Sequence, residues 1–144
     1  MPLGPRPADV PRIPIVLRVF RVSAIITGLF LLLLCLMMVF RYGMGYDIEY
    51  TTAYGLQLTP RELIEERGGT NLSAIILITH GWLYVLYIAC DFLLWRFTRW
   101  SFARFLFIAL GGIIPLLSFF FEFRVPRWTR ETLAAATPPQ EATV

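Results

Sequence analysis

The apolar stretch from Ser73 to Trp95 constrains the fold of this chain more than any other feature. Asp91 is its one charged residue, and a helix over its length crosses the ~30 Å hydrocarbon core of a bilayer. It also contains His80, the one histidine of the chain. The stretch therefore predicts a membrane protein, and its polar side chains must face something other than lipid.

The composition supports this prediction. Hydrophobic residues make up 57% of the 144 residues and charged residues only 16%, whereas about a quarter of the residues of soluble domains are charged. The thirteen basic residues are all arginines, and they stand at the ends of apolar runs rather than in one basic patch. We therefore expect a bilayer as the surroundings of this chain and no nucleic-acid partner.

Two further stretches are free of charge, residues 22–40 and residues 105–121. Together with the first stretch they predict an all-α membrane protein with three transmembrane helices, at about residues 15–40, 73–95 and 101–123. Gly111, Gly112 and Pro115 interrupt the third stretch. Such residues are tolerated in membrane helices and bend them, and the glycines allow close helix contact.

The remaining segments are polar or rich in proline. Residues 1–14 contain five prolines and predict a flexible N-terminal arm, and residues 124–144 predict a flexible C-terminal tail. Residues 15–123 form the transmembrane domain, with residues 41–72 as an external loop. Within this loop residues 46–54 predict a short strand or an irregular loop. A capping-box pattern from Thr59 to Glu62 and a stop at Gly68-Gly69 predict a short helix near residues 60–67.

The distribution of arginines predicts an orientation in the plasma membrane. The N-terminal region and the turn at residues 96–104 are basic, whereas the 41–72 loop is net acidic. The positive-inside rule then places the N-terminus and the 96–104 turn in the cytoplasm, with the 41–72 loop outside. Three spans place the C-terminus outside as well, although the tail carries Arg124, Arg127 and Arg130.

Four polar residues of the 73–95 stretch share one helical face. His80, Tyr84, Tyr87 and Asp91 are spaced i, i+4, i+7 and i+11, so they form a single stripe along a helix. We call this set the polar stripe. It must lie against other helices, a partner protein or a water-filled path.

The expected partners of the polar stripe are charged residues at matching depths. Arg18 and Arg21 share a face near the cytoplasmic end of the first helix, so we expect either of them to pair with Asp91. Glu122 lies at the outer end of the predicted third helix, which makes a hydrogen bond with His80 the matching outer pair. An unpaired charge within a bilayer costs ~2.5–3.5 kcal/mol, so pairing is expected whether or not these residues serve a function.

Two functions are compatible with these residues. The leading hypothesis is a membrane protein without enzymatic activity, an accessory or assembly subunit that packs against other membrane proteins, for example in a respiratory or transport complex, or against itself. The alternative is a small oligomeric proton-coupled transporter or channel that uses the His, Tyr and Glu side chains. The sequence contains no catalytic motif and no metal-binding cluster, and we expect no cofactor.

Several motifs together resemble a known family. They are LRVFRVSAI, HGWLYVLY, a W-x-x-x-R-W-S turn preceded by an acidic residue, and PLLSFFFE, all between Leu17 and Glu122. This pattern resembles a family of small actinobacterial integral membrane proteins that is classed only as a domain of unknown function. The best-matching positions are Arg21, His80, Gly81, Tyr87, Pro115, Phe119 and Glu122. The resemblance implies a three-helix plasma-membrane protein and implies no activity.

Overall fold

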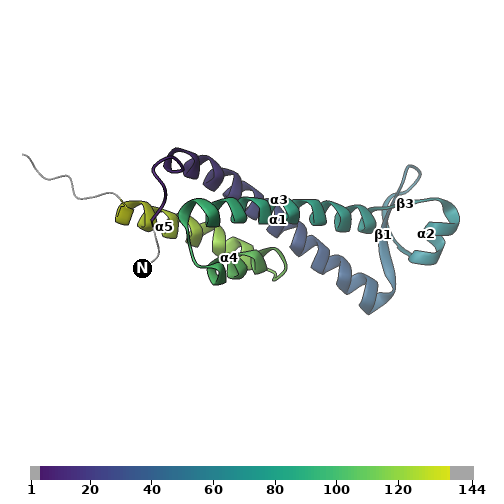
Figure 1. Ribbon diagram of the computed structural model, residues 1–144. Helices are drawn as coiled ribbons and strands as arrows, with labels where there is room; N and C mark the ends of the chain where they lie inside the picture. Colours follow the sequence, from purple (N-terminus) through teal and green to yellow (C-terminus); the bar gives the residue numbers. More distant parts are fainter. Residues whose placement is uncertain (1–3, 137–144) are drawn as a thin grey trace, which may run out of the picture.

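Two long apolar helices run through the molecule and cross each other (Figure 1). The structure, a computed structural model, describes residues 4–136. Helix α1 spans Ile13–Val39, with a 3-10 turn at Val10–Arg12 before it and a π-helical turn at Phe40–Met44 after it. Helix α3 spans Leu72–Thr98. Within the described residues these two helices are long and apolar enough to cross a membrane, which agrees with the spans predicted at 15–40 and 73–95.

The third predicted span is not one helix. Residues 101–123 are divided between helix α4, Phe102–Ala109, a 3-10 turn at Leu110–Gly112, and helix α5, Leu117–Ala136. The chain reverses at residues 113–116, where Pro115 has no N–H to continue a helix and Leu116 adopts the left-handed region with φ of 69°. Helix α5 therefore returns toward the end of the molecule at which α4 begins (Figure 1). We call α4, the turn and α5 the helical hairpin.

The hydrophobic core lies where the hairpin packs against α1 and α3, which also contact each other. The two long helices contribute Phe20 and Leu94 to it, and α5 contributes Phe121 and Val125, all four without solvent exposure. Gly28 of α1 brings the first turn of α5 close, since a Cβ at this position would collide with the side chains of residues 118 and 119. The hairpin reaches only part of the way along α1 and α3, so their remaining halves lack this third layer (Figure 1).

The end of the molecule away from the hairpin carries a small antiparallel sheet. Its strands are β1 (Tyr46–Thr51), β2 (Gly55–Pro60) and β3 (Thr70–Asn71), in the order β2-β1-β3. The fold is therefore mostly helical rather than all-α. Of the two alternatives expected at residues 46–54, a short strand or an irregular loop, the structure has the strand, which is part of a sheet. Helix α2, Arg61–Arg67, lies where a short helix was predicted. The capping box is absent, because residue 59 belongs to β2 and makes no cap hydrogen bond.

A carboxylate joins this sheet to both long helices. Asp47 of β1 accepts two hydrogen bonds from the Arg41 guanidinium, at 2.8 and 2.7 Å, and a third from the Asn71 side chain at 3.1 Å. The hydrogen bonds from Arg41, chiefly, hold the pKa of Asp47 below its ordinary value. Asn71 also caps α3, since its side chain accepts the N–H of Ala74 at 3.1 Å. The end of α1 and the start of α3 are thereby tied to one strand.

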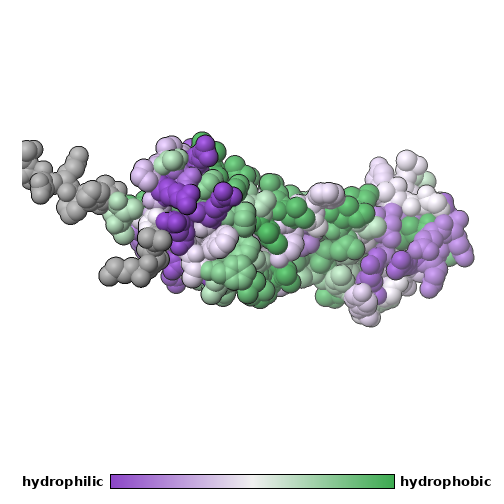
Figure 2. Space-filling view, in the orientation of Figure 1, coloured by the Kyte–Doolittle hydropathy of each residue, from purple (hydrophilic) through white to green (hydrophobic). Residues whose placement is uncertain are grey.

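Hydrophilic residues gather at the two ends of the molecule, with a belt of hydrophobic surface between them (Figure 2). We call the end with the strands and α2 the acidic end and the opposite end the basic end. The basic end contains the N-terminal turn, the 96–104 turn and the last turns of α5, with Arg6, Arg12, Arg96, Arg99, Arg104, Arg127 and Arg130. An apolar belt of this extent on two long helices indicates association with a membrane.

The two ends of the described chain lie together at the basic end. The Trp100 indole donates to the Thr132 hydroxyl at 2.9 Å, and Gly4 lies against Ala136. The last described residues of α5 therefore lie at the same end of the molecule as the N-terminal turn, and the predicted placement of the C-terminus on the opposite side of the membrane stays a prediction. Residues 124–136 also belong to a helix rather than to an unstructured tail. The rest of the predicted tail, 137–144, and residues 1–3 of the predicted arm lie outside the described residues.

This arrangement predicts the accessibility of single cysteines. In a variant with Cys35 and Cys90 replaced by alanine, cysteines at Ala8 and Ala135 should react with a membrane-impermeant maleimide from the same side of the bilayer. A cysteine at Glu65, in α2, should react only from the other side. Labelling of residues 8 and 135 from opposite sides would contradict the helical hairpin and restore a third complete span.

Candidate functional site

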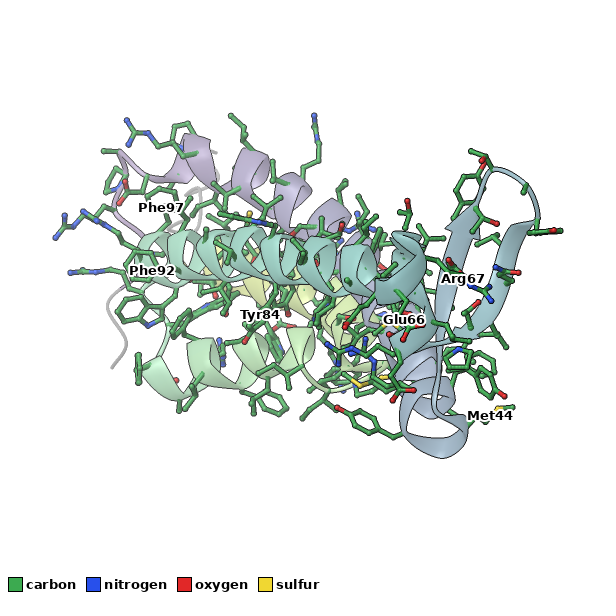
Figure 3. All side chains as sticks on the ribbon, turned by 90° about the vertical axis from the view of Figure 1, so that its right-hand side faces the viewer. Met44, Glu66, Arg67, Tyr84, Phe92 and Phe97 are labelled. Atoms are coloured by element: carbon green, nitrogen blue, oxygen red, sulfur yellow. The ribbon has the colours of Figure 1, made fainter. Side chains whose placement is uncertain are left out.

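The polar stripe of α3 faces the helical hairpin. The Tyr84 side chain lies between α3 and α4 (Figure 3), and its hydroxyl donates to the backbone carbonyl of Ala109 at 3.2 Å. The hydroxyl of Tyr87, which is completely buried, donates to the carbonyl of Ile108 at 2.8 Å. The two tyrosines of the polar stripe thus bind the last residues of α4.

These bonds pair backbone carbonyls that lose their usual helical donors where the chain reverses. The last carbonyls of a helix have no partner within the helix, and burial without one costs ~1–3 kcal/mol for each group. In α4 the N–H of Ile113, which would continue the helix to Ala109, bonds instead to Leu110. Ile108 and Ala109 are themselves buried, so side chains rather than solvent must complete the pairing. Tyr84 and Tyr87 supply the two hydroxyls.

The paired glycines permit this close approach. A Cβ at Gly111 would lie 2.7 Å from the Tyr87 hydroxyl oxygen and 2.7 Å from the ring of Phe121, closer than real side chains pack. A Cβ at Gly112 would overlap the Tyr84 ring. The prediction that these glycines serve close helix contact is therefore confirmed, with the tyrosine rings as the contacting groups.

Arg21 and Glu122 form the ion pair that joins α1 to the hairpin. The Arg21 guanidinium donates twice to Glu122 Oε1, from Nη2 at 2.6 Å and from Nε at 3.1 Å. The Glu122 side chain is only 8% exposed, whereas that of Arg21 is 51% exposed. The pair predicted between His80 and Glu122 is absent. The reversal at residues 113–116 brings Glu122 beside residue 21 of α1 and away from residue 80.

The other predicted pairs are also absent. Asp91 is completely buried, and neither of its carboxylate oxygens accepts a hydrogen bond from the residues that the structure describes. Arg18 is exposed and lines an apolar groove between α1 and α3, and no ion pair joins it to Asp91. Asp91, the charged residue of the polar stripe, is therefore buried without an ion pair or a hydrogen bond to any of residues 4–136.

His80 occupies the end of the polar stripe beyond the hairpin. Its ring is half-buried and stacks on that of Tyr84, with centroids 6.4 Å apart and planes within 3° of parallel. Its Nδ1 atom is buried and makes no hydrogen bond to a described residue. A neighbouring contact was missed by sequence reasoning: the Thr27 hydroxyl of α1 donates to the Leu83 carbonyl of α3 at 3.3 Å. A small hydroxyl residue inside an apolar run was the available signal.

The arrangement does more to hold helices together than to assemble reactive groups. The Tyr84 and Tyr87 hydroxyls are engaged with backbone carbonyls, and Glu122 is engaged with Arg21. Among the described residues no group of three or more His, Cys, Asp or Glu side chains is placed to hold a metal ion. His80 and Asp91 remain as polar groups without a hydrogen-bond partner at the atoms named above.

Comparison with known protein families matches residues 17–127 to the family described as Domain of unknown function (DUF3817). The chain belongs to the DUF3817 family. The predicted relationship to an uncharacterised family is thus confirmed, and the actinobacterial source stays a prediction. No curated protein and no solved structure matches the chain. The DUF3817 match includes the polar stripe, both glycines of the hairpin, and the Arg21–Glu122 pair.

The tyrosine bonds predict a specific loss of stability. Tyr87→Phe removes the side-chain donor of the buried Ile108 carbonyl while preserving the ring, so the free energy of unfolding should fall by about 1 kcal/mol. Reversible unfolding in mixed micelles with increasing dodecyl sulfate measures this change. Tyr54→Phe is the matched control, because Tyr54 is 81% exposed in the turn between β1 and β2. Equal effects of the two variants would contradict the role given to Tyr87.

The ion pair predicts a non-additive double-mutant cycle. Arg21→Gln leaves the buried Glu122 carboxylate without its cation, so it should lower the stability of the protein in mixed micelles more than Glu122→Gln does. The double variant should recover part of the loss caused by Arg21→Gln alone. Simple addition of the two single effects would show that the pair contributes nothing to the packing of α5 on α1.

Proposed function

We propose that this DUF3817 protein is a multipass plasma-membrane protein without enzymatic activity, which serves as an assembly subunit through helix-to-helix contacts in the bilayer. In this proposal α1 and α3 cross the membrane, and the hairpin enters it from the cytoplasmic side and returns. The positive-inside rule supports this orientation, because the basic end then lies in the cytoplasm and the acidic end outside. Because the chain reverses at residues 113–116, this orientation also puts the arginines of α5 on the cytoplasmic side, where the positive-inside rule expects them.

The observation that carries the proposal is the face of α3 opposite the polar stripe. Ile78, Gly81, Trp82, Val85 and Ala89 are all exposed there, and outside α3 no described residue lies within 4 Å of the place a Gly81 Cβ would occupy. Gly81 and Ala89 are small residues two turns and a little apart on this face, and small residues let another helix backbone approach closely. We call these five residues the open face of α3.

Trp82 makes lipid a poor cover for the open face. It is 73% exposed and lies about 15 Å along α3 from Leu72, which is near mid-depth in a ~30 Å hydrocarbon core. Tryptophan normally sits at the membrane interface, where its indole N–H finds a partner. Acyl chains offer no acceptor at mid-depth, whereas a neighbouring helix offers carbonyls, side chains and an apolar surface.

A second copy of the chain is the occupant that the open face fits. Gly81 provides a hollow and Trp82, the next residue, provides a protruding ring. A two-fold related copy in the same orientation therefore places each Trp82 beside the hollow of the other α3. The contact is self-complementary, and it leaves the polar stripe and the hairpin of each copy undisturbed on the opposite side of α3.

The transporter alternative has less support. Its proposed relay requires Tyr84 and Glu122, but the Tyr84 hydroxyl donates to Ala109 and Glu122 is bound by Arg21. His80 and Glu122 also do not form the pair that the relay would use.

Fluorescence transfer between labelled copies in liposomes, measured at increasing lipid dilution, tests the proposal. Wild-type protein should associate, and Gly81→Leu should weaken the association about tenfold or more by blocking helix approach. Ala103→Leu, on the exposed surface of α4, is the matched control for added bulk. Trp82→Ala should also weaken association, whereas Phe123→Ala, an exposed aromatic on α5, should not.

Two outcomes would contradict self-association. Wild-type protein could stay monomeric at every dilution, or Gly81→Leu could behave like Ala103→Leu. Mild-detergent purification from the host then separates the remaining possibilities. A companion membrane protein that is lost with Gly81→Leu but kept with Ala103→Leu would assign the open face to a different subunit. Purification without companions would overturn the assembly function itself.

A further inference from the structure

The basic end carries a hollow whose cations have no partner. The hollow has a volume of about 370 Å³ and lies between the N-terminal turn and the turn that follows α3. Its lining consists of Arg6, Asp9, Trp95, Arg96, Arg99 and Trp100. Three arginines and a single acidic residue thus line one opening. In residues 4–136 none of the three forms an ion pair or a side-chain hydrogen bond.

An unused donor adjoins these cations. The Nε1 atom of Trp95 is buried but donates to no described residue, although Trp95 lines the hollow. A buried indole N–H without an acceptor is unfavourable, and an oxygen atom that reached it from the hollow through a small shift of the ring would relieve it. The Trp100 indole differs, because its N–H already donates to Thr132. The free donor and the free guanidiniums together fit an anion that has several oxygen acceptors.

The backbone holds Arg99 at this opening. Arg99 ends α3 in the left-handed conformation, with φ of 56°, and its N–H bonds to the Trp95 carbonyl at 2.9 Å. This closes the last turn of α3 and occupies one of the carbonyls that would otherwise repel an anion. Arg96 lies one turn earlier. The position of two cations beside Trp95 is thus a consequence of how α3 ends.

The surroundings of the hollow indicate that the anion belongs to a lipid. Trp95 packs against Phe92, Phe102 and Phe105, with ring centroids 5.5, 6.0 and 5.7 Å away. Phe92, labelled at this end of α3 in Figure 3, and Phe102 are exposed on the apolar belt. An aromatic surface therefore continues directly from the cationic hollow into the belt. This matches a phospholipid, whose phosphate and acyl chains are joined in the same order.

We propose that this hollow binds the phosphate headgroup of an anionic phospholipid of the cytoplasmic leaflet. Arg96, Arg99 and Arg6 contact the phosphate oxygens, and the Trp95 indole donates to one of them. The acyl chains lie over Phe92 and Phe102. Basic pockets on the cytoplasmic side of transmembrane helices recognise lipid headgroups by this combination of charge and hydrogen bonding.

The test measures how added lipids change the thermal unfolding of the purified full-length protein in dodecyl maltoside. The three probes are short-chain phosphatidylglycerol, short-chain phosphatidylcholine and sodium phosphate. Phosphatidylglycerol should raise Tm saturably, with an apparent Kd at least tenfold lower than that for phosphatidylcholine. Sodium phosphate should have no comparable effect, because it lacks the chains that contact the aromatic surface.

Variants separate the hollow from the general charge of the basic end. The double variant Arg96→Gln/Arg99→Gln should raise the apparent Kd for phosphatidylglycerol about tenfold or more. The control Arg12→Gln/Arg127→Gln removes the same charge from exposed positions at the same end, and should leave the Kd nearly unchanged. If the first double variant does not fold, the single variants Arg6→Gln and Trp95→Phe replace it. Each should raise the apparent Kd for phosphatidylglycerol, by less than the double variant would.

Three results would overturn the proposal. Equal shifts with the two lipids would show that the headgroup charge is not recognised. An equal shift with sodium phosphate would assign the hollow to a soluble anion. Equal losses in the two double variants would indicate attraction to the basic end as a whole. None of these results depends on self-association through the open face of α3, which lies outside the hollow.

Discussion

The pairing of backbone carbonyls where α4 ends is the constraint on which the rest of the structure depends. A helix that stops in an apolar region exposes carbonyls that neither lipid nor core can satisfy. Here the hydroxyls of Tyr84 and Tyr87 donate hydrogen bonds to the carbonyls of Ala109 and Ile108. The tyrosine rings can come this close because residues 111 and 112 are glycines. Without these bonds, ending α4 here would leave buried carbonyls with fewer donors, and a longer helix would be favoured. The polar stripe of α3 thus makes a reversal possible.

The reversal then determines the electrostatic pairing and the distribution of charge. It returns α5 along α1, so that Glu122 meets Arg21 and the later arginines of α5 join those of the N-terminal turn and the 96–104 turn. A continuous third helix would have carried Glu122 and three arginines to the acidic end. The basic end and the acidic end are well separated because the third segment turns back.

The sequence predicts the elements of this fold better than their arrangement. Long uncharged runs predict α1 and α3, and the Gly68-Gly69 stop correctly predicts the end of α2. The hairpin could not be foreseen, because glycine pairs and a proline are tolerated in continuous membrane helices and a bend cannot be told from a reversal by composition. The conflict of Arg124, Arg127 and Arg130 with three spans was the one available sign.

For the candidate site, too, the sequence predicted the residues better than their contacts. That His80, Tyr84, Tyr87 and Asp91 share a face is a matter of helical spacing, but their partners depend on the path of the third segment. The predicted pair of His80 and Glu122 assumed a complete third span, and it failed for that reason. The predicted pair of Asp91 with the first helix also failed, because Arg21 is bound by Glu122 and Arg18 is exposed. The acceptors of the tyrosines are main-chain atoms, which leave no mark in the sequence beyond the small residues that make room for them.

The two sides of α3 therefore have different roles. One side carries nearly all of its hydrogen-bonding groups and is used within the chain, where it holds the hairpin. The other side carries Gly81 and Trp82 and has no contact within the described chain at the Gly81 position. A helix built only to anchor the hairpin would need neither an exposed glycine nor a tryptophan at mid-depth, since leucine meets lipid at less cost. The internal side explains how this protein folds, so the external side is where an assembly role has its strongest support.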